Sequence, residues 1–75
     1  MDSVYAELTS REKEILKLIA KNATNTEIAS KLHISIKTVV NYATLIFSKL
    51  QVADRKEAEE LARRWKMDTE MFSGG

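Results

Sequence analysis

The sequence has no cysteine, no proline and only two glycines, which are its last two residues. Without cysteine the chain can form neither a disulfide nor a thiolate metal site, and a cytoplasmic protein is the matching expectation. Tight β-hairpins normally need glycine, Asn-Gly or Asp-Gly at the turn, and none of these is available inside the chain. These absences predict an all-α fold.

Long apolar runs are missing too, since no stretch approaches the roughly 18 residues that a membrane span requires. The start, "MDSVYAELTS", lacks the basic and apolar parts of a signal peptide. A chain of 75 residues suits one domain, and it leaves little room for both a core and a deep substrate cavity. There is no glycine-rich phosphate loop and no cluster of metal ligands. We therefore expect no membrane contact, no enzyme activity, no catalytic or metal-binding residue and no cofactor.

Capping signals mark the first two helices. "TSRE" (9–12) matches the capping box, in which a Thr hydroxyl and a Glu carboxylate satisfy free backbone N–H groups at a helix start. That helix should end near Asn22, because Asn tolerates the left-handed conformation. "TNTE" (24–27) is a second capping box, and it opens a short helix. His33 follows that helix, and we expect it to hold a turn at positive φ rather than bind a metal.

Ser35 is a suitable N-cap for a third helix, and Asp54 with Glu57 should cap a fourth. The second helix is short, the link after it has two or three residues, and the third helix is about fifteen residues long. A short helix, a tight turn and a longer helix form the helix-turn-helix arrangement. The predicted fold class is therefore an all-α four-helix bundle that contains a helix-turn-helix.

Apolar residues at helical spacing predict the core. In the third helix they form the series Val39, Ala43, Ile46 and Leu50, flanked by Tyr42 and Phe47. The other predicted core residues are Leu8, Ile15, Ile19, Ile28, Leu32, Leu61 and Trp65.

The outer face of the third helix has an unusual composition. It consists of Lys37, Val40, Asn41, Thr44 and Ser48. An ordinary solvated helix face is rich in Glu, Lys, Gln and Arg, whereas this one has short polar and branched side chains. Short side chains suit close approach to another surface. Asn can bond bidentately to adenine, and Thr or Val methyls can meet a thymine methyl in a major groove. A nucleic-acid face is favoured, while a protein-contact face and a plain exposed face stay open.

Charge alone does not predict a nucleic-acid partner, because 12 basic and 11 acidic residues give a net charge of only +1. The distribution is more informative. Residues 35–51 contain two lysines, Lys37 and Lys49, and no acidic residue. The third helix is thus the part of the chain without negative charge.

Four segments carry a family resemblance. "LTSREKEILKLIA" (8–20), "TEIASKLHIS" (26–35), "KTVVNY" (37–42) and "IFSKLQVADRKEA" (46–58) together resemble the LuxR/NarL/FixJ-type, GerE-like helix-turn-helix domain of bacterial transcription regulators. The resemblance covers about residues 8–67, and it divides the chain into a lead or linker (1–7), the domain (8–67) and a flexible tail (68–75).

The resemblance implies sequence-specific binding of double-stranded DNA by a regulator's output domain, with residues from about 36 to 50 in the major groove. The implied base-reading residues are Val40, Asn41 and Thr44, and the implied phosphate contacts are Asn25, Thr26, Lys37, Thr38 and Lys49. It also implies a homodimer through the fourth helix, with Glu59, Ala62 and Arg63 as possible contacts, a possible contact with RNA polymerase, and a receiver or ligand-sensing domain beside this one.

One departure from the family pattern bears on affinity. Position 40 is often Lys or Arg in that family and is Val here, which reduces the electrostatic part of DNA binding. The alternative is a protein-interaction module of the same fold, which binds another regulator or RNA polymerase with weak or no DNA binding.

Overall fold

The computed structural model describes residues 6–65, and within this range it has four α-helices and no strand. The helices are α2 (Ser10–Ala20), α3 (Asn25–Leu32), α4 (Ile36–Leu50) and α5 (Arg55–Arg64). This confirms the predicted all-α fold class. The predicted tail (68–75) and most of the predicted lead (1–7) lie outside the described residues, and the domain limits stay a prediction.

Each helix starts at the predicted N-cap. Thr9 and Glu12 form a complete capping box at α2, with the Thr9 N–H 2.8 Å from Glu12 Oε1 and the Glu12 N–H 3.1 Å from Thr9 Oγ1. Thr24 and Glu27 repeat it at α3 with the same two distances. Ser35 Oγ accepts from the backbone N–H of the third residue after it, and so does a carboxylate oxygen of Asp54 at α5. These bonds satisfy N–H groups that have no partner inside the helix.

Three helices end in the same way, through a residue with positive φ. Asn22, His33 and Gln51 have φ of 68°, 59° and 57°. In each case the next residue, Ala23, Ile34 or Val52, donates its N–H to a carbonyl five residues back at 3.0 to 3.1 Å and rests against the core. The turn roles predicted for Asn22 and His33 are confirmed. Gln51 also takes the left-handed conformation, which its residue type does not predict.

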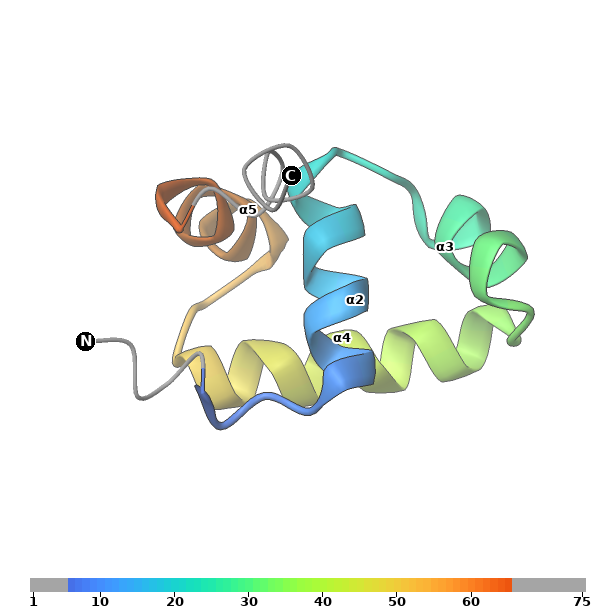
Figure 1. The fold of residues 1–75 in the computed structure, drawn as a ribbon, viewed down its shortest axis with the longest axis horizontal. Coiled ribbons are helices and arrows are strands. Elements are labelled where there is room, and N and C mark those ends of the chain that lie inside the picture. Colours follow the sequence, from blue (N-terminus) through green and yellow to red (C-terminus); the bar gives the residue numbers. More distant parts are fainter. Residues whose placement is uncertain (1–5, 66–75) are drawn as a thin grey trace.

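Helix α4 lies along one edge of the molecule, and the other helices pack on one side of it (Figure 1). α2 crosses it near its middle, α3 sits over its first half and α5 near its second half. Close contacts join α2 with both α4 and α5, and α3 with α4. On the opposite side, residues 37, 40, 41, 44, 45 and 48 of α4 stay exposed, while the segment before α2 runs beside the second half of the helix (Figure 1).

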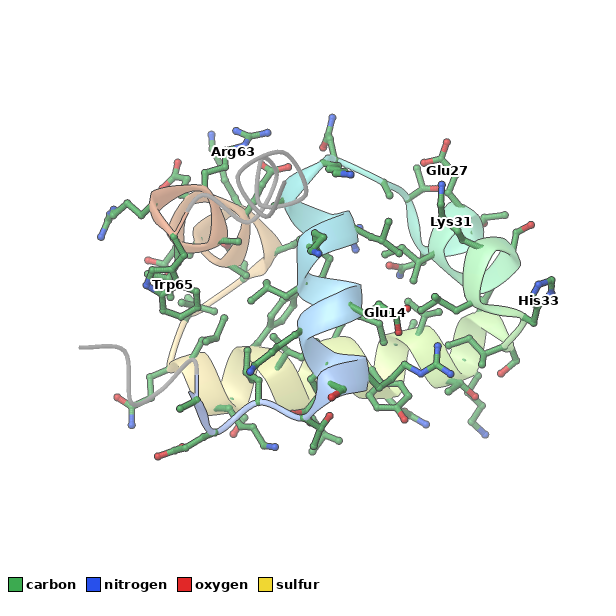
Figure 2. All side chains as sticks on the ribbon, in the orientation of Figure 1. Glu14, Glu27, Lys31, His33, Arg63 and Trp65 are labelled. Carbon is green, nitrogen blue, oxygen red and sulfur yellow. The ribbon has the colours of Figure 1, made fainter. Side chains whose placement is uncertain are left out.

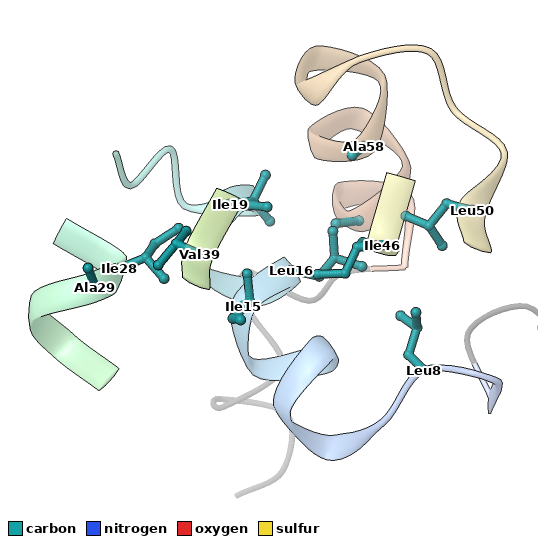
Figure 3. Packing of buried hydrophobic residues seen from close by; sticks show 12 residues of the cluster. Leu8, Ile15, Leu16, Ile19, Ile28, Ala29, Val39, Ile46, Leu50 and Ala58 are labelled. Carbon is teal, nitrogen blue, oxygen red and sulfur yellow. The ribbon is translucent and has the colours of Figure 1, made fainter. Parts of the chain in front are cut away.

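The core lies between α2 and its three neighbours. Ile28 and Val39 meet α2 on one side, while Ile46 and Ala58 approach it on the other (Figure 3). The predicted series of α4, Val39, Ala43, Ile46 and Leu50, is buried, as are Leu8, Ile15, Ile19 and Ile28. Leu32, Leu61 and Trp65 are only half-buried against this core, so they cover its rim.

Candidate nucleic-acid interface

The helix-turn-helix is formed by α3, a three-residue link and α4. His33 makes the turn possible with φ 59° and ψ 44°, and Ile34 follows it into the core rim. The His33 side chain is exposed at the far corner of the molecule (Figure 2). Among residues 6–65, no group of three or more His, Cys, Asp or Glu side chains is placed to hold a metal ion. His33 therefore has a structural explanation in its backbone conformation.

The uncovered face of α4 carries the residues that the helical spacing assigned to it. Lys37, Val40, Asn41, Thr44 and Ser48 are all exposed. Three large apolar side chains are also exposed on α4: Ile36 at 49%, Val40 at 44% and Leu45 at 52%. These side chains are available for contact with a partner, although single exposed apolar residues are common on protein surfaces.

Two neighbouring side chains on this face differ in their hydrogen bonding. Thr44 Oγ1 donates to the backbone carbonyl of Val40 at 3.0 Å, so its one hydroxyl proton is used within the helix. The amide of Asn41 has no hydrogen-bond partner among residues 6–65. Asn41 thus presents both a donor and an acceptor to whatever approaches α4.

The two lysines of α4 have different environments. Lys37 is exposed and has no ionic partner in the described part of the chain. Lys49 Nζ lies 2.8 and 3.1 Å from the two carboxylate oxygens of Glu12 and 3.5 Å from the Glu7 carbonyl. Its three N–H donors already face three acceptors. A phosphate contact by Lys49 stays a prediction, and it would require the ammonium group to share or leave Glu12.

Glu12 is the one buried charged residue of the described chain, with 3% of its surface exposed. Burial disfavours its charged form, but the hydrogen bond from Lys49, the N–H of Thr9, the charge of Lys49 and the Thr9 hydroxyl together outweigh this effect. The pKa of the Glu12 carboxyl is therefore held below its ordinary value. One carboxylate thus caps α2 and anchors the end of α4.

The lowered pKa of Glu12 predicts a loss of stability in acid. Its contribution is present above the unfolded-state pKa, about 4.3 for a Glu, and is lost as the pH falls through the lower folded-state value. Glu12→Gln should lower the free energy of unfolding at neutral pH by about 1 to 2 kcal/mol. Urea unfolding of both proteins across pH checks this. The gap between them should narrow below about pH 4, and a gap independent of pH would contradict the assignment.

Of the two predicted phosphate-contacting residues near the start of α3, Asn25 is hydrogen-bonded to α5. Arg55, the first residue of α5, donates to Asn25 Oδ1 at 2.6 Å and also to the Ala23 carbonyl. The Asn25 oxygen is thereby occupied, which leaves its NH₂ group as a donor. Thr26 beside it is exposed. Thr38 is half-buried and its hydroxyl is 2.8 Å from Ser35 Oγ.

The three possible dimer contacts of α5 do not share one environment. Ala62 is fully buried against the core within this chain. Its contact with a second copy stays a prediction. Arg63 is exposed, and Glu59 is half-buried beside it with their charged groups 3.7 Å apart. The Arg63 Nε also donates to the Ala20 carbonyl at 3.3 Å, so both residues have partners within the chain.

No helix within residues 6–65 has the length and apolar character needed to cross a membrane. A short helix joined by a left-handed turn to a longer helix forms a helix-turn-helix, the arrangement in which DNA-binding domains place the longer helix in the major groove. The comparisons agree with this class. The model of the family described as "Bacterial regulatory proteins, luxR family" matches residues 6–62. The chain therefore belongs to the luxR family of bacterial regulatory proteins, whose members bind DNA through this domain.

Individual relatives match the same region. The response regulator proteins VraR of Staphylococcus aureus, Staphylococcus saprophyticus and Staphylococcus epidermidis are each 56% identical to this chain over 55 residues. The aligned part covers 73% of this chain and 26% of each relative. The chain thus spans about a quarter of the length of these curated relatives.

Proposed function

We propose that this domain reads specific sequences in duplex DNA by placing α4 in the major groove, as the output domain of a response regulator. The observation that carries the proposal is the open face of α4: Val40, Asn41 and Thr44 are exposed together, with no acidic residue between positions 35 and 51. A helix of this kind fits the major groove, where base edges differ in their donors, acceptors and methyl groups.

Phosphate contacts would fix the domain on the duplex without reading sequence. Lys37 supports this role because it is exposed and has no ionic partner in the described chain. The NH₂ group of Asn25 and the exposed Thr26 are the donors offered by α3. Thr38 and Lys49 are further candidates, but each already has a partner inside the domain. With few unpaired cations on this face, we expect modest affinity for the isolated domain.

The finer features of a regulator also belong to the proposal. A homodimer through α5 would use the exposed Arg63 and the partly exposed Glu59. A contact with RNA polymerase, control by a receiver or ligand-sensing domain and a place in the cytoplasm are parts of the same proposal, and the resemblance to response regulators supports them. No enzymatic role is proposed for any residue.

Selection of sites from a random duplex pool at low salt, followed by a salt titration, tests the proposal. We expect a defined sequence to be enriched, and log K to fall linearly with log salt concentration because phosphate binding releases counterions. Two half-sites at a fixed spacing in the enriched sequences would indicate a dimer. Binding without enrichment would contradict sequence-specific reading.

A second function, a protein-interaction module, is favoured by one observation. Ile36, Val40 and Leu45 are roughly half exposed, and such side chains suit an apolar partner. An apolar contact responds little to salt. Absence of DNA binding even at low salt, together with salt-independent capture of another regulator or RNA polymerase, would favour this function.

A further inference from the structure

Two of the three predicted base-reading residues of α4, Val40 and Thr44, carry methyl groups. Val40 and Thr44 lie one helical turn apart and are both exposed, so their side chains are neighbours on the surface. Val40 offers only methyl groups. Thr44 has its hydroxyl proton in the 3.0 Å bond to the Val40 carbonyl. What Thr44 presents to an incoming surface is therefore its methyl and a remaining oxygen lone pair, not a donor.

Asn41 lies beside Thr44, three residues before it, and adds an amide to the same face. It is exposed, and its amide has no partner among residues 6–65. An amide matches the N6 donor and N7 acceptor that adenine shows in the major groove, whereas the usual partner of guanine is Arg or Lys. The three reading positions carry no cation to bind guanine and no carboxylate to accept from cytosine N4.

Thymine is the base whose major-groove edge carries a methyl group. A pair of adjacent methyl-bearing side chains with an amide beside them is thus complementary to A·T pairs. We propose that α4 recognises a run of A·T base pairs, with Val40 and Thr44 in contact with thymine C5-methyl groups and Asn41 bonded to an adjacent adenine. This inference rests on the proposed function, since it names the duplex that the same face reads.

Deoxyuridine provides a sharp test because it differs from thymidine only by the absent C5-methyl group. The probe is the duplex enriched from the random pool, prepared again with each thymine in turn replaced by uracil. Base pairing and the acceptor O4 are unchanged. Loss of one buried methyl should weaken binding about three- to fivefold. We expect this three- to fivefold decrease in affinity when uracil replaces either of two thymines in each half-site. Uracil at the other thymines should leave the affinity unchanged.

Two variants assign the effects to residues. Val40→Ala removes the two Cγ methyl groups of position 40, and Thr44→Ser removes a methyl while keeping the hydroxyl. Each variant should lose the uracil effect at one of the two sensitive thymines, so that it binds the thymine duplex and the duplex with uracil at that position with equal affinity. Leu45→Ala is the matched control, because it also shortens an exposed apolar side chain of α4 outside the three reading positions. It should keep both uracil effects. Circular dichroism and thermal unfolding of each variant verify that the domain is folded.

The outcomes separate this inference from the function on which it rests. An enriched site that binds equally well with uracil, or one without A·T pairs, would overturn the methyl recognition while leaving DNA reading intact. Uracil effects that persist in both variants would overturn the assignment to Val40 and Thr44. A pool without any enriched sequence would overturn the proposed function, and the inference with it. Position-specific uracil effects that each variant removes would establish it.

Discussion

Replacing Ile28 by Ala should cost about 2 to 5 kcal/mol of folding free energy, which is the usual range when a fully buried Ile is truncated. Ile28 has 0% of its surface exposed. It lies near Val39 of α4 and faces α2 (Figure 3). The cavity left by the missing methyl groups would therefore form between the two helices of the helix-turn-helix and the helix that supports them.

The expected loss for Ile28→Ala would be a large fraction of the domain's total free energy of unfolding. A domain of 75 residues has about 4 to 11 kcal/mol of stability at the usual value per residue. Urea unfolding followed by far-UV circular dichroism measures the change. Ile36→Ala is the matched control, because the same atoms are removed at a position that is 49% exposed. That variant should lose less than about 1 kcal/mol. Equal losses at both positions would show that Ile28 is not a core residue.

The features predicted correctly from the sequence are those decided within a few residues. A capping box needs only a Thr and a Glu three positions apart, so Thr9 and Glu12 could be paired by inspection. The core series of α4 follows from helical periodicity in the same way. The left-handed turn at Gln51 escaped prediction because Gln, unlike Asn, has no marked preference for positive φ.

Contacts between distant parts of the chain could not be predicted. The capping role of Glu12 was evident, but its ion pair with Lys49, 37 positions away, depends on how α2 crosses α4. The same is true of Arg55 and Asn25, which meet because α5 starts beside the loop after α2. Lysines near a predicted DNA face look alike in a sequence. The structure separates Lys37, which is exposed, from Lys49, which binds a buried carboxylate.

In the candidate site, too, the sequence predicts which residues are exposed but not which hydrogen bonds their side chains make. Helical spacing identified the outer face of α4, and Val40, Asn41 and Thr44 are exposed there. Spacing cannot say what each side chain offers. The bond from the Thr44 hydroxyl to the Val40 carbonyl is a choice of side-chain conformation. It changes Thr44 from a possible hydrogen-bond donor into a methyl-bearing surface, which is the basis for expecting A·T pairs.

The largest effect on DNA reading should come from Asn41→Ala. Asn41 offers an unpaired amide in the described chain, and loss of a bidentate bond to one base costs about 1 to 3 kcal/mol. Affinity for the enriched duplex should fall about five- to 150-fold, while affinity for random duplex of the same length should change little. The preference at one base pair should relax, because the other contacts do not depend on that base.

Lys37→Ala is the variant that separates base reading from phosphate binding. Lys37 is exposed on the same face and carries the charge that Asn41 lacks. Its loss should lower the affinity for the enriched and the random duplex by the same factor. It should also reduce the slope of log K against log salt concentration by about one. Fluorescence anisotropy with both duplexes at several salt concentrations measures these quantities. If Asn41→Ala lowers the affinity for the enriched and the random duplex by the same factor, Asn41 contacts the DNA backbone. The bases would then be read by Val40 and Thr44 without its help.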